Sequence, residues 1–493
     1  MKKEGNHLSA YSDLIKQELL SILHNSKGLI VKGVGEGIAV SYMSGMVDTA
    51  QLNLHILGRL PHHKQAVTLE QVQDIVNIGD CQIIEQLEDG MEKLLNGFAL
   101  CTVVGYSGGV LMNVINIPAK SPGTAEKETV LYGPMIAFTE NMDKNIALVR
   151  SYITNPNLVQ ETVKVGKKTH TIVNLLYMHQ EGGNPFAELA KQRFSEFQGD
   201  GFIGSAMTLH ILKDQHFSIF PEMSLTELPD KTSQALLEGK VVVMVEGNSQ
   251  VLIGPNSFFD FYHSTEDRYS PLGIGTFFRV LRLLGLVMSI YLTPLYVAAL
   301  TFHYEVIPMT LLVPLISSRA RVPYPPLIEC LILEVAMSLL REASARLPTK
   351  VAQTMGIVGA IVIGQAAVEA GLTSNVLILL IAFAALGSYT NPNYMMSGSS
   401  RVIRYPFILV AGYFGFIGIA FLTAVLAIHL LRMTSLGKPY LFPLYPVNKD
   451  GIYRGLIMSQ RSAFQYKSDL TSMNGKGTVR KRIHHFLSKD HDE

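Results

Sequence analysis

Five charged residues interrupt an apolar stretch in the second half of the chain and give the strongest chemical signal in the sequence. They are Glu329, Glu334, Arg341, Glu342 and Arg346. Ionisable side chains are costly in hydrocarbon, so they normally face the interior of a helix bundle, a water path or one another. The stretch therefore predicts a membrane protein whose function depends on polar groups at depth.

The spacing of these residues predicts a helix with charges on two faces. Glu342 and Arg346 are four positions apart with the acid first, which is the better order for a helical ion pair. Glu334 and Arg341 share another face by the helical repeat. Two interpretations remain open: buried ion pairs that hold helices or subunits together, or direct contact with permeating ions.

A second apolar segment, rich in glycine and alanine, follows the charged helix. Gly356, Ala360 and Gly364 are spaced four apart, so they form a ridge of small residues. Such a ridge allows a neighbouring helix to approach closely. We therefore expect this face to pack against another helix.

A different face of the same segment combines branched apolar residues with polar ones, at Val358, Val362, Gln365 and Glu369. Two branched side chains can form a constriction that excludes water, beside a wetter vestibule lined by the polar pair. The alternative is a buried helix whose glutamine and glutamate are satisfied by neighbouring groups. Physical reasoning alone leaves both interpretations open.

The remaining reactive residues lack the spacing of a catalytic or metal site. Cys81, Cys101 and Cys330 are few, odd in number and far apart, which fits a reducing compartment without a disulfide framework. The paired histidines at 62–63 and 484–485 lack the spacing of metal ligands. The sequence contains no Walker A, H-E-x-x-H or G-x-S-x-G motif. We therefore expect no enzyme activity, no cofactor and no metal.

Apolar segments that suit a bilayer gather in the second half of the chain. Four are predicted to span, and two that are short or charged either span or stay buried in protein. The four are Val280–Phe302, Met355–Leu372, Ser374–Tyr389 and Phe407–Leu431, and the other two are Val306–Ile316 and Leu327–Leu340. The predicted count is therefore four to six spans.

Charge and hydropathy place both terminal regions on the cytoplasmic side. No apolar signal segment follows Lys2–His7, so the N-terminal region is expected to begin in the cytoplasm. The chain after Lys449 has a basic excess that includes Arg480, Lys481 and Arg482, which favours the cytoplasmic face. An even number of spans agrees with this arrangement.

The first 275 residues are predicted to form a soluble α/β region in two parts. Turn residues at 33–37 and 107–109 separate paired strands, and Leu69–Ile78 has helical spacing with a capping box at Thr68. A helix break at Asn155-Pro156-Asn157 marks the predicted division. The predicted organisation is two α/β subdomains at 1–155 and 156–275, a helical membrane domain at 276–435 and a basic cytoplasmic tail at 436–493.

Four motifs surround the charged helix in a specific order. They are Arg-Val-Pro-Tyr-Pro at 321–325, Leu-Leu-Arg-Glu-Ala at 339–343, Arg-Leu-Pro at 346–348 and Ile-Val-Gly-Ala-Ile-Val-Ile-Gly-Gln-Ala-Ala-Val-Glu-Ala-Gly at 357–371. Their order and spacing resemble the A subunit of the GerA-type spore germinant receptors, and further blocks at 132–150, 236–240 and 266–269 extend the resemblance. Tyr132 and Leu228 stand where that family usually has arginines, so contacts made by those arginines are not expected here.

The resemblance implies the A subunit of a nutrient germinant receptor in the inner membrane of a bacterial spore. It implies a transporter-like B subunit that holds the germinant, a lipoprotein C subunit and contact with membrane lipid. It also implies a homo-oligomer that opens a cation channel, which favours the pore interpretation of the face that contains Val358 and Val362.

Two other functional classes remain open. One is a secondary transporter acting alone, although the two hydrophobic halves show no inverted repeat. The other is a membrane-tethered enzyme or signalling protein, although the catalytic motifs of an enzyme are missing. A net charge of +1 argues against a nucleic-acid partner.

Overall fold

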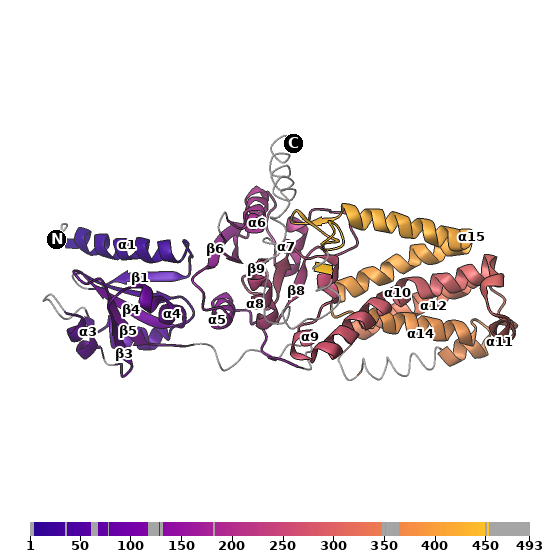
Figure 1. The fold of residues 1–493 in the computed structure, drawn as a ribbon, viewed down its shortest axis with the longest axis horizontal. Helices are drawn as coiled ribbons and strands as arrows, with labels where there is room; N and C mark the ends of the chain where they lie inside the picture. Colours follow the sequence, from indigo (N-terminus) through magenta and orange to yellow (C-terminus); the bar gives the residue numbers. More distant parts are fainter. Residues whose placement is uncertain are drawn as a thin grey trace.

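The computed structural model consists of two α/β units followed by a helical region (Figure 1). The predicted fold class, a two-part α/β region joined to a helical one, is confirmed by these elements. The structure describes residues 4–34, 37–60, 68–76, 78–116, 128, 132–180, 183–347, 351, 364–448 and 451–452.

The first unit is built on a five-stranded antiparallel sheet with the order β1-β2-β4-β5-β3. One face packs under α3, and the other packs under α1 and α4. The strands are β1 (Leu29–Gly33), β2 (Ile38–Met43), β3 (Cys81–Ile84), β4 (Phe98–Val103) and β5 (Gly109–Asn113). The helices are α1 (Glu4–Ile22), α2 (Thr49–Gln51), α3 (Leu69–Ile75) and α4 (Met91–Leu95).

Local sequence signals position several of these elements. The predicted strand pairs are present as β1–β2 and β4–β5. The capping box at the start of α3 is present as well: the Gln71 N–H donates to Thr68 Oγ1 at 3.3 Å, and the Thr68 N–H donates to Gln71 Oε1 at 3.0 Å. α3 ends at Ile75, before the predicted Ile78, because Val76 is extended.

The second unit repeats the same layout around a sheet with the order β6-β7-β9-β10-β8. One face packs under α6 and α7, and the other packs under α5 and α8. The strands are β6 (Leu158–Val165), β7 (Thr171–Met178), β8 (Ser224–Thr226), β9 (Val241–Val245) and β10 (Val251–Gly254). The helices are α5 (Met142–Tyr152), α6 (Pro185–Glu196), α7 (Ser205–Leu212), α8 (Pro229–Leu237) and the short α9 (Glu266–Tyr269).

The second unit begins earlier than the predicted boundary at residue 155. Ile146 and Val149 of α5 share a buried cluster with Leu158 and Leu176 of the second sheet. The chain does turn at Asn155-Pro156-Asn157, but the turn leads from α5 into the edge strand β6 within the same unit. The boundary therefore lies before α5.

The helical region contains α10 (Leu272–Phe302), α11 (Met309–Arg319), α12 (Pro326–Arg346), α14 (Asn375–Tyr389) and α15 (Tyr394–Arg432). One apolar core is formed by four of these helices, α10, α12, α14 and α15. Leu315 of α11 packs against this core. Within the described residues, α10 and α15 are long and apolar enough to cross a membrane, and α11 and α14 are shorter apolar helices. The count of four to six spans stays a prediction.

The helix α15 is two antiparallel segments that meet at Gly415. This residue has φ 62° and ψ −144°, a conformation that only glycine adopts readily. Ser399 Oγ donates to the carbonyl of residue 219 at 2.7 Å, and His429 Nε2 lies 3.2 Å from the hydroxyl of residue 218. Both segments therefore return to the second unit, whereas the sequence predicted one uninterrupted span at Phe407–Leu431.

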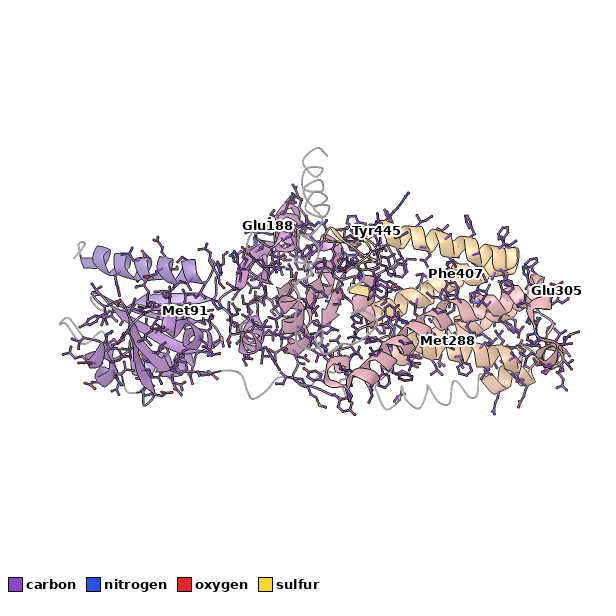
Figure 2. All side chains as sticks on the ribbon, viewed as in Figure 1. Met91, Glu188, Met288, Glu305, Phe407 and Tyr445 are labelled. Atoms are coloured by element: carbon purple, nitrogen blue, oxygen red, sulfur yellow. The ribbon has the colours of Figure 1, made fainter. Side chains whose placement is uncertain are left out.

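The chain after α15 also returns to the second unit, through the small hairpin of β11 (Thr434–Ser435) and β12 (Lys438–Pro439). Tyr440 is fully buried, and its hydroxyl donates to the carbonyl of Pro221 at 2.8 Å. Figure 2 shows Tyr445 beside this unit and Glu305 at the opposite end of the helices. The predicted tail boundary at residue 436 thus falls inside a segment that belongs to the second unit.

Candidate functional site

Two deeply buried charges of the helical region form an ion pair where four helices meet. Arg404 of α15 donates through Nη1 to both carboxylate oxygens of Glu334 on α12, at 2.9 Å each. The two side chains are only 4% and 6% exposed. The hydroxyl of Thr293 on α10 donates to the same carboxylate at 3.2 Å. A charge this deep needs its partner, because water cannot replace the lost interaction.

The rest of the Arg404 guanidinium is also satisfied. Its Nη2 donates to the hydroxyl of Ser289 on α10 at 3.0 Å and to the carbonyl of Ala384 on α14 at 3.1 Å. Its Nε donates to the carbonyl of Ser289. An arginine whose three nitrogens all have acceptors in the protein acts as a cross-link between helices. This geometry favours the structural interpretation of Glu334 over direct contact with a passing ion.

Glu329 forms a second buried polar cluster nearer the start of α12. It is completely buried and accepts from the N–H of Ser374 at 2.7 Å, and from Arg319 Nε and the Thr373 hydroxyl at 3.2 Å each. The Ser374 hydroxyl in turn caps α14 by accepting from the Leu377 N–H at 3.3 Å. Glu329 therefore joins α11, α12 and the start of α14.

The other three predicted ion-pair residues are not buried within this chain. Glu342 and Arg346 form the expected pair at 2.6 Å, but their side chains are 63% and 78% exposed. Arg341 donates to the hydroxyl of Tyr389 at 2.9 Å and lies over its ring. Within this chain the charged residues of α12 therefore lie in separate clusters, and the partner of Glu334 comes from another helix.

The predicted gate and the predicted packing ridge are only partly covered by the structure. Gln365 and Glu369 are exposed in a helical stretch at 364–369, and Gly364 of the ridge is half-buried. The remaining residues of both predictions lie outside the described residues: Val358, Val362, Gly356 and Ala360. The gate therefore stays a prediction.

A close helix contact through small residues occurs at a place that the sequence analysis did not single out. Gly285 of α10 and Gly387 of α14 lie against each other, and a Cβ on Gly285 would lie 2.9 Å from the carbonyl oxygen of Gly387. Such an approach allows strong packing between apolar helices. It fixes α14 against the first long helix.

An ion-pair cluster anchors the second unit to the beginning of α10. Asp267 on α9 is buried and accepts from both Nη atoms of Arg282, at 2.7 and 2.8 Å, and from Arg279 Nε at 3.2 Å. Burial alone would raise the pKa of Asp267, but the guanidinium groups of Arg282 and Arg279 outweigh it and hold that pKa below its usual range. These ion pairs therefore join α9 of the second unit to the beginning of α10.

A small polar pocket of about 100 Å³ lies at the same junction. Its walls include Lys240, which lies 3.3 Å from Glu238 and 3.2 Å from Asp260, and Arg268, which pairs with Glu238. Two further basic side chains of the lining are paired with carboxylates outside it, Lys231 with Glu128 and Arg279 with Asp267. In the part of the chain that the structure describes, no group of His, Cys, Asp and Glu side chains is arranged to hold a metal ion.

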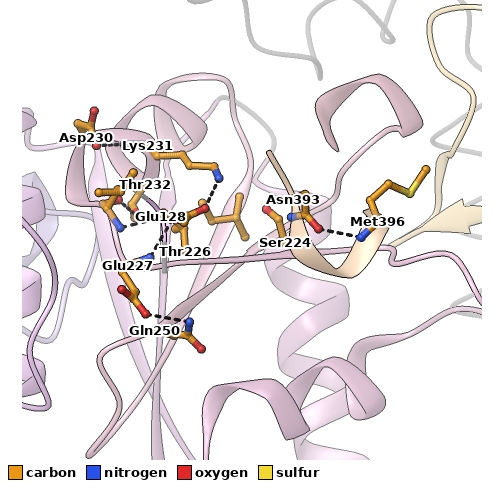
Figure 3. Close-up of polar contacts among 12 residues, drawn as sticks. Glu128, Ser224, Thr226, Glu227, Asp230, Lys231, Thr232, Gln250, Asn393 and Met396 are labelled. Atoms are coloured by element: carbon orange, nitrogen blue, oxygen red, sulfur yellow. Dashed lines mark hydrogen bonds and ion pairs between the residues drawn. The ribbon is translucent and has the colours of Figure 1, made fainter. Parts of the chain in front are cut away.

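Glu128, which lies between the two α/β units in the sequence, contacts the second one (Figure 3). Its carboxylate accepts from the Thr226 hydroxyl, from the Glu227 N–H at 3.2 Å and from Lys231 Nζ at 2.7 Å. Glu227 itself accepts from Gln250 Nε2 at 3.1 Å. The Glu128 carboxylate thus contacts both β8 and α8.

The two α/β units also contact each other directly through Arg150 on α5. Its side chain is 1% exposed, and its Nη2 donates to the Ser26 hydroxyl of the first unit at 3.0 Å. Beside it, the Lys27 N–H donates to the carbonyl of Gln160 at 3.0 Å. Arg150 belongs to a block that carries the family resemblance, and its observed role is to join the units.

Sequence reasoning missed Arg404 and the contact of Arg282 with Asp267. Arg404 lies before the predicted span at Phe407–Leu431, so it is not among the charges that the sequence predicts inside the membrane. The useful signal was an arginine directly before a long apolar run, because a charge next to such a run is expected to find an acidic partner. The acidic candidates on the charged segment were Glu329, Glu334 and Glu342.

Comparison with known proteins matches residues 13–469 to the family described as Bacillus/Clostridium GerA spore germination protein. Spore germination protein GerQA of Bacillus cereus is 39% identical over 477 residues, which is 95% of each chain. Spore germination protein KA of Bacillus subtilis is 34% identical and aligns over 85% of this chain and 78% of its own. Among solved structures, the N-terminal domain of the A subunit of the Bacillus megaterium spore germinant receptor GerK3 is similar at 23% identity and a TM-score of 0.37, covering 49% of this chain and 94% of that domain.

Proposed function

The chain belongs to the Bacillus/Clostridium GerA spore germination protein family, and we propose that it is the A subunit of a nutrient germinant receptor that triggers spore germination. The observation that carries the proposal is a match extending across both α/β units and the helices. Relatives named as spore germination proteins align over nearly the whole chain. These relatives support a role in germination. The action of the chain as part of a nutrient receptor is what we propose in addition.

The proposed location is the inner membrane of the spore, with the N- and C-terminal regions in the cytoplasm. Large apolar side chains are exposed along α10 and α15, among them Phe277, Leu284, Phe414 and Phe421. Extended apolar surfaces of this kind suit lipid or partner subunits better than water. The α/β units carry no comparable apolar run in sequence, which supports their placement outside the bilayer.

The proposed mechanism is a ligand-gated cation channel formed by several copies of this chain with B and C subunits. The germinant binds the B subunit, and its differential affinity for the open state shifts the A-subunit oligomer. Within this chain, Glu334–Arg404 holds the helices in register while Asp267 and the segment after α15 connect them to the second unit. Val358, Val362, Gln365 and Glu369 are the proposed gate.

Counting subunits and measuring ion flux test this proposal. The chain is purified with its B and C subunits and examined by native mass spectrometry, then reconstituted into vesicles loaded with potassium. A ring of A subunits with nutrient-dependent potassium release supports the channel. A monomer that takes up the nutrient without partners would establish the alternative, a secondary transporter acting alone.

A further inference from the structure

The loop at residues 213–221, here called the Phe217 loop, presents two large apolar side chains outward from the second unit. Phe217 is completely exposed and Ile219 is 52% exposed. They alternate with Ser218 and Phe220, which are 7% and 3% exposed. These two outward side chains form a small exposed apolar patch, which is a suitable contact for an apolar partner.

The Phe217 loop is held in this conformation by its inward residues. The Phe220 ring packs near those of Phe258 and Tyr440, with centroids 6.5 Å away in both cases. The base of the loop is fixed by Glu222, which accepts from the N–H groups of Asp214 at 2.7 Å and Gln215 at 3.0 Å. The loop therefore cannot turn its exposed side chains inward without losing its own core.

The Phe217 loop lies beside both ends of the α15 hairpin. The carbonyl of Ile219 accepts from Ser399 Oγ at 2.7 Å, and Gln215 Nε2 donates to the carbonyl of Arg432 at 3.4 Å. Ser399 is five residues inside the start of α15 at Tyr394, a rise of about 7 Å along the helix. The loop is thus level with the first turns of the first segment and with the last turn of the second.

Basic side chains flank the two apolar ones. Lys213 lies within the loop, His216 is exposed directly before Phe217, and Arg432 is exposed at the end of α15. An apolar tip with a basic rim is the pattern of a segment that enters the boundary between lipid headgroups and acyl chains. A soluble protein partner would not require this placement at the level of the helix ends.

We propose that Phe217 and Ile219 insert into the boundary of the membrane leaflet on the side of the α/β units. The loop then holds the second unit against the surface of the bilayer, and the α15 hairpin anchors the same unit from inside the bilayer. This inference rests on the proposed membrane location of α15, and it adds a lipid contact made by the soluble unit itself.

The absence of tryptophan from the chain provides a direct probe. Phe217→Trp creates the only tryptophan, at a side chain that is fully exposed, so the fold is not disturbed. The full-length protein is reconstituted into vesicles of phosphatidylcholine and phosphatidylglycerol with or without bromine on the acyl chains. Brominated lipid quenches a tryptophan that lies among acyl chains, and the emission of a buried tryptophan shifts to shorter wavelength.

Two matched variants provide the controls. Phe421→Trp is placed at a 69% exposed site on the second segment of α15, eleven residues before its end, and is expected to be quenched within the bilayer. Ile203→Trp is placed at an 85% exposed site at the opposite end of α7 and is expected to stay unquenched. The proposal predicts that Phe217→Trp loses emission in brominated vesicles and is blue-shifted relative to Ile203→Trp.

The other quenching results separate a failed lipid contact from a failed membrane location. Quenching of Phe421→Trp without quenching of Phe217→Trp overturns the lipid contact and leaves the membrane location intact. A third outcome is a Phe217→Trp emission that is blue-shifted but not quenched by brominated lipid. If that emission also shifts to longer wavelength when the oligomer dissociates, the loop contacts a protein neighbour and the proposal is overturned. Failure to quench both variants contradicts the membrane location on which the inference depends.

Discussion

At the scale of single residues, the helical region depends on two buried carboxylates with different partners. Glu334 is held by Arg404, and Glu329 by Arg319 together with hydroxyl and backbone donors. Both acids were identified from the sequence because a carboxylate in an apolar helix demands a partner. The partners were not identified, because each is on another helix and depends on how the helices pack.

Glu334→Ala should strongly destabilise the protein, because it leaves Arg404 buried without its carboxylate. Breaking such a pair costs roughly 3–5 kcal/mol, whereas Glu342→Ala removes an exposed pair and should cost about 0–1 kcal/mol. Heating the purified protein in detergent and following the monodisperse fraction compares the two variants. Adding Arg404→Leu to Glu334→Leu should recover much of the loss, and equal melting of the two alanine variants would rule out the buried cross-link.

Asp267→Asn should weaken the attachment of the second unit to α10 near neutral pH. The folded-state pKa of Asp267 lies below the ordinary 3.8, so its ion pairs stabilise the fold above that value and lose their effect as the pH falls through the lowered pKa. The melting temperatures of wild type and variant should therefore differ most near neutral pH and converge in acid. A difference that grows in acid would contradict the pairing with Arg279 and Arg282.

At the scale of elements, the sequence predicts what is local and misses what depends on distant contacts. The capping box at Thr68 and the strand pair across 33–37 rest on neighbouring residues, and both are present. The edge strand β6 was missed because its segment, Leu158–Val165, lies next to turn residues and has several polar positions. The reversal at Gly415 was missed because one glycine in an apolar run does not distinguish a turn from a packing contact.

Gly415→Ala should disrupt the α15 hairpin. An alanine Cβ would lie 2.6 Å from Cε1 of His303, and the backbone conformation itself costs a non-glycine residue roughly 1–3 kcal/mol. Gly398→Ala is the control within the same helix, because its nearest neighbour is a flexible arginine nitrogen 3.8 Å away. That change should be neutral or stabilise by about 0.5–1 kcal/mol. Thermal unfolding in detergent separates the two, and equal tolerance would show that α15 does not turn at Gly415.

At the scale of the whole molecule, the second unit is the centre of the connections. It contacts the first unit through Arg150, meets α10 through Asp267, and is completed by the hairpin after α15. The sequence predicted the order of the parts but assigned residues 436 onward to a separate tail. Packing of a late segment onto an early unit leaves no local pattern, so only the structure could reveal it.

A fragment of residues 1–270 should be soluble, with a first unit of normal stability and a weakened second unit. It lacks Tyr440, which is fully buried and accepts from the Phe258 N–H at 2.7 Å. Hydrogen exchange should show normal protection in β1–β5 and reduced protection around Pro221 and Phe258. Joining residues 433–446 to the fragment by a flexible linker should restore that protection, and a fragment unfolded throughout would show that the units do not fold without the helices.

Release of monovalent cations from spores tests whether this chain is needed for the response to a nutrient. The comparison uses a strain in which this chain belongs to the only intact germinant receptor, the same strain lacking the chain, and that strain with the chain restored. We expect a nutrient to trigger potassium release only in spores that contain the chain, before any other sign of germination. Nutrient-triggered release with unchanged kinetics in spores that lack the chain would contradict it.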